Sequence, residues 1–153
     1  MKLIISIFLS QLVFVFQVYA EVSLPLQLPD QHDAQVTTTD STKWILFASD
    51  MDGYKLTRDA LEKLKITDLS QFQLCFVADI SGMPSLIGKM FAMPKMRKLP
   101  YQILLDREAK VTSGWPKKEK HLTLMKVENS KVIESKFLAT PDEVKTLFES
   151  GLK

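Results

Sequence analysis

The residues in this chain that are most able to take part in binding or catalysis are Asp-Met-Asp-Gly-Tyr-Lys at positions 50–55. They separate an apolar run from a helical pattern. Tyr54 carries a phenol whose ordinary pKa is about 10, whereas the thioether of Met51 cannot ionise. Asp50 and Asp52 flank Met51, but two acids in a turn ahead of a helix typically cap that helix, and no third ligand or base lies near them in the sequence. We therefore interpret this stretch as a helix start, where unpaired backbone N–H groups and the positive end of the helix dipole are available to a ligand.

The single cysteine, Cys75, lies within the apolar run Phe-Gln-Leu-Cys-Phe-Val-Ala. Thiol–disulfide exchange requires an attacking thiolate and a resolving thiol. A chain with one cysteine therefore cannot be a dithiol oxidoreductase, and it cannot form an internal disulfide. A thiol on a buried strand usually behaves as a small inert hydrophobic group, so we expect Cys75 to be buried and unreactive.

Three methionines, Met90, Met93 and Met96, have the spacing Met-x-x-Met-x-x-Met. Because thioether ligands favour Cu(I), a copper-binding protein is one alternative. Methionine also fills gaps in protein cores, and Met90 falls on the predicted buried face of a helix, so we favour core packing. His32 and His121 have no metal-ligand spacing to each other or to a cysteine. The sequence thus predicts no cofactor and no resident metal.

Composition and charge are those of an ordinary globular domain. The 153 residues are 46% hydrophobic and 25% charged, and the net charge of +2 argues against nucleic acid as a partner. The five glycines form neither G-x-G-x-x-G nor a P-loop, so a nucleotide cofactor is not indicated. Basic residues gather at two places, which we interpret as solvated surfaces, with attraction of an acidic partner or of lipid headgroups as the alternative for the first: Lys89, Lys95, Arg97 and Lys98, then Lys117, Lys118 and Lys120.

The first twenty residues have the features of a secretory signal. Lys2 precedes a long apolar stretch that ends in Val18-Tyr19-Ala20, an A-x-A-like cleavage site. We predict cleavage after Ala20 and a periplasmic or secreted protein. An uncleaved segment would instead anchor the chain in a membrane, because the stretch is nearly long enough to span a bilayer.

The remaining chain predicts alternating strands and helices. Residues 21–43 are polar, carry Pro25 and Pro29, and are interpreted as an extended segment or linker with little structure of its own, followed by a domain over residues 44–153. The predicted strands cover residues 44–49, 72–80, 101–106, 120–128 and 131–139. The last two should form a hairpin across Asn129-Ser130.

Three helices follow from periodicity and capping. The first has Leu56, Ala60, Leu61 and Leu64 at helical spacing after the 50–55 turn, and the last begins with a Thr-Pro-Asp-Glu capping box at residues 140–143. The middle helix follows Ser81-Gly82 and carries one apolar face, which we expect to be buried: Leu86, Ile87, Met90 and Phe91. The order of elements requires a crossover and predicts an α/β fold, a mixed sheet flanked by helices.

This order, with Leu99-Pro100 opening the strand after the second helix, resembles the thioredoxin family. The resemblance covers residues 42–150 and aligns Met51 and Tyr54 with that family's two active-site cysteines, with Asp52 and Gly53 between them. It implies that Pro100 matches the proline whose cis peptide faces the active site. The chain departs from the family in having no cysteine pair and in adding one strand after the core, which we place at the sheet edge. The stretch from Ala78 to Pro100 is also similar to small exported proteins of Gram-negative bacteria.

The resemblance without the thiols predicts a binding surface in place of a redox centre. We expect this surface to comprise Met51, Asp52, Gly53, Tyr54, Leu99 and Pro100, and to bind a protein or an extended peptide in the cell envelope. An alternative from another class is an enzyme that does not depend on a thiol, such as a glutathione-transferase-like activity in which Tyr54 polarises the bound thiol.

Overall fold

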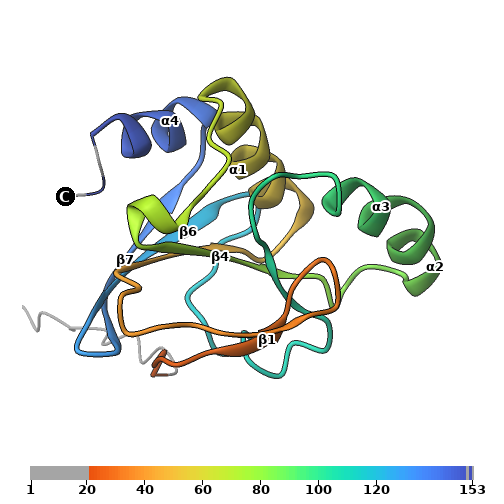
Figure 1. Cartoon of the computed structure of the whole chain (residues 1–153), viewed down its shortest axis with the longest axis horizontal. Coiled ribbons are helices and arrows are strands. Elements are labelled where there is room, and N and C mark those ends of the chain that lie inside the picture. Colours follow the sequence, from red (N-terminus) through yellow and green to blue (C-terminus); the bar gives the residue numbers. More distant parts are fainter. Residues whose placement is uncertain (1–20, 151, 153) are drawn as a thin grey trace, which may run out of the picture.

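A five-stranded mixed sheet forms the centre of the protein, which we describe from a computed structural model covering residues 21–150 and 152 (Figure 1). The signal peptide predicted for residues 1–20 lies outside the described residues. The strand order is β5-β4-β3-β6-β7. The strands are β3 (Trp44–Ala48), β4 (Leu74–Asp79), β5 (Leu104–Asp106), β6 (Leu122–Glu128) and β7 (Lys131–Leu138).

Strands β3, β4 and β5 run parallel, and β6 and β7 complete the sheet in antiparallel pairs. Strand β3 is buried on both faces, which explains its unbroken apolar sequence. The predicted α/β class is confirmed, and β7, the last strand after the core, lies at one edge of the sheet, where the extra strand was expected. The β6–β7 hairpin is also confirmed. Asn129 and Ser130 have φ values of 49° and 61°, as a type I′ turn requires.

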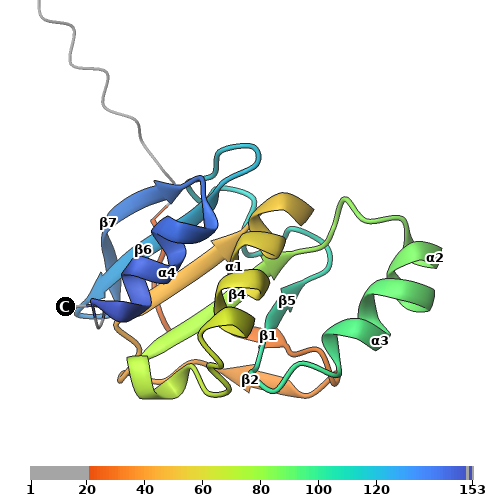
Figure 2. The same cartoon turned by 90° about the horizontal axis from the view of Figure 1, so that it is seen from above.

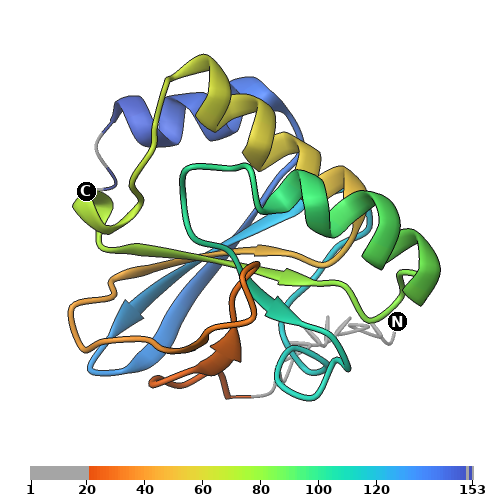
Figure 3. The ribbon, with the colours of Figure 1, turned by 45° about the vertical axis from the view of Figure 1, so that its right-hand side comes forward.

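Helices α1 (Met51–Lys63) and α4 (Pro141–Glu149) cover one face of the sheet (Figure 3). The predicted capping box of α4 is present, because the Thr140 hydroxyl accepts the Glu143 N–H and the Glu143 carboxylate accepts the Thr140 N–H. The core on this face joins Leu46 and Phe76 of the sheet to Leu61 of α1 and Phe148 of α4.

The opposite face is covered by residues 21–43, contrary to the expectation of a linker with little structure. This segment forms a small antiparallel pair, β1 (Gln27–Pro29) and β2 (Gln35–Thr37). Val22, Leu26 and Leu28 are buried in a second core against sheet residues of the face opposite the helices. Val22, Leu24, Leu26 and Leu28 stand at every second position, which is a strand pattern, but the prolines and polar residues around them favoured the interpretation as a linker.

Polar contacts, buried at Gln31 and exposed at Asp33, fasten this segment to the chain on both sides of β5. Gln31 is buried, its amide donates to the Tyr101 carbonyl at 2.7 Å, and its amide oxygen accepts the Ile103 N–H at 2.9 Å. Asp33 forms ion pairs with Arg97 and Arg107 at 2.7 and 2.5 Å. The segment is therefore an integral layer of the fold.

The arm, which we define as residues 85–96, projects beyond β5 at the end of the molecule away from α4 (Figures 1 and 2). It consists of α2 (Ser85–Ile87), the π-helical turn η2 (Gly88–Ala92) and α3 (Met93–Met96); the remaining short element, the 3₁₀ turn η1 (Ser70–Phe72), precedes β4. The prediction of a buried apolar face on this helix is wrong: Leu86, Ile87, Met90 and Phe91 are 68%, 50%, 60% and 59% exposed. Only Met93 and Met96, one turn further on, reach the core.

None of the helices in the part of the chain that the structure describes has the length and apolar character needed to cross a bilayer.

Candidate functional site

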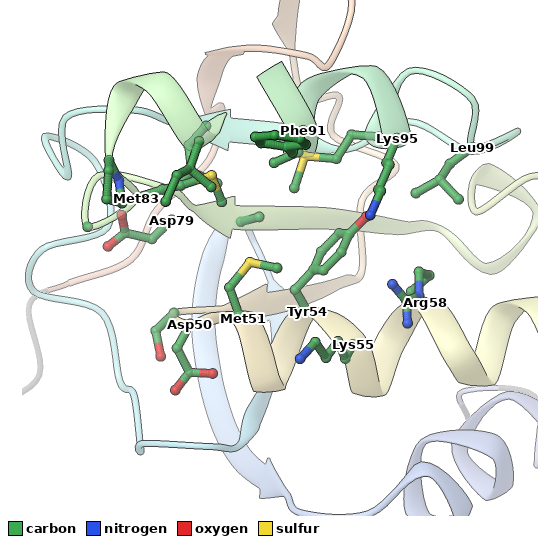
Figure 4. Close-up of a pocket in the computed structure, with 18 residues that line it drawn as sticks. Asp50, Met51, Tyr54, Lys55, Arg58, Asp79, Met83, Phe91, Lys95 and Leu99 are labelled. Carbon is green, nitrogen blue, oxygen red and sulfur yellow. The ribbon is translucent and has the colours of Figure 1, made fainter. Parts of the chain in front are cut away.

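A groove of about 640 Å³ lies between the first half of α1 and the arm (Figure 4). This volume is within the range of small-molecule binding sites. Side chains from α1, from the end of β4 and from the arm line it, and most of them are apolar. The lining comprises Ser49, Asp50, Met51, Tyr54, Lys55, Arg58, Ala78, Asp79, Ile80, Gly82, Met83, Pro84, Ile87, Phe91, Ala92, Lys95, Met96 and Leu99.

The groove includes half of the predicted surface. Met51, Tyr54 and Leu99 line it, whereas Asp52, Gly53 and Pro100 do not. The arm residues Ile87 and Phe91 contribute a wall that the sequence reasoning missed. Their apolar helical spacing predicts burial in the core, whereas in the structure both side chains are exposed and face the groove.

Asp50 begins α1 and also ties the neighbouring loop to the helix. Its Oδ1 accepts the Gly53 N–H at 2.8 Å, and its Oδ2 accepts the Lys120 N–H at 2.7 Å. Gly53 lies directly against this loop, since a Cβ at that position would be 2.6 Å from the His121 carbonyl oxygen. Part of the helix terminus that was expected to be free for a ligand is therefore occupied by the protein's own carboxylate and backbone.

The expected cis peptide at Pro100 is a second correction. Leu99–Pro100 is trans, and the cis bond in the described residues precedes Pro25. The reason is topological. The strand beside β3 is β6, not the strand that follows Pro100, which pairs with β4 at the opposite edge. The segment from Lys118 to His121 consequently occupies the place beside the start of α1 that the resemblance assigned to Pro100.

Tyr54 forms part of the floor of the groove and points from α1 toward the arm (Figure 4). Its ring is buried and stacks on Phe76, with centroids 6.2 Å apart and an interplanar angle of 13°. Burial raises the pKa of Tyr54, and the nearby Asp59 carboxylate adds to this effect, although Arg58 opposes it. The phenol therefore stays protonated at neutral pH, where it can donate or accept a hydrogen bond but cannot act as a base.

Charged side chains stand at the two ends of the groove. Asp50 and Asp79 lie at the end nearest the start of α1, and Arg58 and Lys95 lie toward the other end (Figure 4). Arg58 is held by Asp59, to which its Nη2 donates at 2.7 Å. Met51, Tyr54 and a further base, Lys55, lie between these two ends (Figure 4).

Cys75 takes no part in this site. It is partly buried and packs against the second core, on the sheet face opposite the helices, where desolvation raises the pKa of its thiol to about 12. A thiol with this pKa is protonated at neutral pH and is a poor nucleophile. Cys75 is thus less buried than expected, and its inert role stays a prediction.

The methionine triplet is divided by the fold. Met93 and Met96 are buried in the helix-side core, whereas Met90 is exposed. Among residues 21–150 and 152, no three His, Cys, Asp or Glu side chains converge as a metal site would require.

Comparison with known proteins identifies the fold. No protein-family model and no curated protein matches the chain. Solved structures do match. The thioredoxin domain of a thiol-disulfide oxidoreductase from Bacteroides vulgatus is similar at 15% identity, with 89% of this chain and 99% of that chain covered and a TM-score of 0.54.

Two further structures have the same architecture. StoA from Bacillus subtilis is 12% identical over 83% of this chain and 98% of its own, with a TM-score of 0.54. An uncharacterised thioredoxin-like protein from Porphyromonas gingivalis is 11% identical over 85% and 89%, with a TM-score of 0.52. The chain therefore has a thioredoxin-like fold, and at these identities the similarity extends to the fold alone.

Proposed function

We propose that this protein is an exported, thioredoxin-like binding protein of the cell envelope that has no dithiol chemistry and holds an apolar ligand in the groove between α1 and the arm. One observation carries the proposal. Met51 and Tyr54, at the positions that the resemblance aligns with the two redox cysteines, both line this largely apolar groove.

The absence of exchange chemistry follows from the side chains. Neither a thioether nor a protonated phenol can attack a disulfide, and the single thiol of the chain is on the other sheet face with a pKa raised by burial. The exposed side chains of Ile87 and Phe91 supply apolar surface at the groove rim, and exposed apolar patches of this kind often mark binding sites.

The proposal includes export by a signal peptide that is cleaved after Ala20. Residues 21–43 would then begin the mature protein as a layer of the folded domain. Mass spectrometry of the envelope fraction should find Glu21 at the N-terminus, and recovery of a chain that still begins at Met1 would overturn this part of the proposal.

Binding of the neutral apolar dye Nile red tests the groove. The wild-type protein should enhance the dye's fluorescence, and Phe91→Asp should weaken binding at least about tenfold, because it places a charge on the apolar wall. Ile133→Asp is the matched control, since Ile133 is 53% exposed on β7 and does not line the groove.

Equal loss of dye binding in both variants, or no binding by the wild type, would contradict the proposed site. An insulin-reduction assay tests the chemistry independently. We expect no activity, and reduction of insulin by the purified protein would contradict a non-redox function.

A further inference from the structure

We propose that the groove's ligand is a short apolar peptide with both ends free, its ammonium group at Asp79 and its carboxylate at Lys95. This inference rests on the proposed function and names the ligand class for the same site. It depends on how the charges are distributed along the groove and on which of them the protein leaves available.

Asp79 is the available acid at one end. Its Oδ1 accepts the Ser81 N–H at 2.9 Å, and no basic side chain of the described residues lies within ion-pair distance of it. Asp50, by contrast, uses both carboxylate oxygens to accept backbone N–H groups. An ammonium group entering this end would therefore find its partner in Asp79.

Lys95 is the available base at the other end. It is exposed and forms no ion pair with the described residues, whereas Arg58 is already held by Asp59 through Nε and Nη2. No acidic residue occurs between Ile80 and Leu105, so this side of the groove is uniformly basic. A ligand carboxylate would be attracted here, first to Lys95 and then to the free edge of the Arg58 guanidinium.

The span between the ends matches a few residues of extended chain. On the α1 side of the groove, Asp50 stands at the same end as Asp79, and Arg58 stands at the same end as Lys95 (Figure 4). Asp50 and Arg58 are eight positions apart, which at 1.5 Å per helical residue separates their backbones by about 12 Å along the groove. An extended peptide covers about 3.3–3.6 Å per residue, so about three to four residues bridge the two ends.

The middle of the groove suits the body of such a peptide. Met51, Phe91 and Ile87 provide apolar surface for its side chains. The Tyr54 hydroxyl forms no hydrogen bond within the described part of the chain, and a peptide carbonyl or N–H would supply its partner. Lys55 also lines the groove, from α1 between the two ends, and it is exposed (Figure 4). A free acid at one end, bases toward the other and apolar surface between them are complementary to a zwitterionic peptide more than to a fatty acid or a neutral lipid.

Isothermal titration calorimetry with trileucine in free, N-acetylated, C-amidated and doubly blocked forms tests this inference. Each block removes one charge and leaves the apolar content. We expect each to weaken binding about threefold to fivefold, the size of a partly exposed ion pair.

Two substitutions test which residue of the groove binds which terminus of the peptide. Asp79→Asn should abolish the effect of N-acetylation and leave that of C-amidation, because the amide oxygen still accepts the Ser81 N–H. Lys95→Gln should do the reverse. Lys98→Gln is the control, since Lys98 is exposed on the same basic stretch but does not line the groove, and both effects should persist in it.

The inference is overturned if the doubly blocked peptide binds as tightly as the free one, if no peptide binds, or if Lys98→Gln acts as Lys95→Gln does. If one of these results is obtained while Nile red still binds and Phe91→Asp weakens that binding, this inference fails but the proposed function stands. A wild-type protein that binds neither dye nor peptide removes both proposals.

Discussion

The segment 21–43 and the arm exchange the roles that their sequences predict. The first is polar and rich in turn residues, yet it buries Leu28 and Gln31 against the sheet and the chain before β5. The second carries an apolar helical face, yet this face is exposed beside the groove. Burial is decided by what lies opposite a side chain, and the sheet leaves one face open to the N-terminal segment but provides no surface under the outer side of the arm.

A matched pair of leucine truncations tests the difference in burial between the two regions most directly. Leu28→Ala should lower the free energy of unfolding by about 2–5 kcal/mol, because Leu28 is 4% exposed and its removal leaves a cavity. Leu86→Ala, at a leucine that is 68% exposed, should change it by less than about 0.5 kcal/mol. Urea denaturation measures both. Similar losses for the two variants would mean that the arm is buried as firmly as the N-terminal layer.

Acid titration tests what holds the second face together. Asp106 is buried and accepts the N–H groups of Val111 and Thr112 at 2.8 Å each, anchoring a loop over that face. Burial acts to raise the pKa of Asp106, but these hydrogen bonds prevail and lower it. A depressed folded pKa stabilises the protein above the unfolded value of about 3.9, and this stability is lost as the pH falls through the folded value.

Asp106→Asn should therefore cost about 2 kcal/mol at pH 7 and less at low pH, where the wild-type carboxylate is itself protonated. Urea denaturation at a series of pH values from neutral to acidic measures this. A cost that is the same at every pH would show that Asp106 contributes by shape alone and not by its charge.

The smallest expected effect concerns the exposed link between the two regions. Asp33→Asn removes the ion pairs to Arg97, just after the arm, and to Arg107, but all three side chains are largely exposed. We expect a loss of about 0.2–1 kcal/mol that disappears in high salt. Thermal unfolding at low and high ionic strength measures it, and a loss above this range that resists salt would place Asp33 among the buried anchors.

Much of the architecture could be predicted from local signals. The capping box at Thr140, the Asn129-Ser130 turn and the strand-to-helix transition at Asp50 each rest on residues close together in the sequence, and each is present. The α1 side of the candidate site was also within reach, because Met51 and Tyr54 belong to one such transition. The arm wall was not, since an apolar helical face has the same pattern whether it meets a core or a ligand.

Residue type and near-neighbour spacing were enough to predict the order of the strands and helices after residue 43, their caps and turns, the α/β class and the lack of a second thiol. Which strand lies beside β3 depends on long-range pairing, and so do the trans state of Pro100 and the position of the Lys118–His121 loop against α1. The tertiary structure also decided which apolar faces are covered. The physical reason is that burial and strand pairing are contacts between residues far apart in the chain, and several partners satisfy the same local pattern equally well.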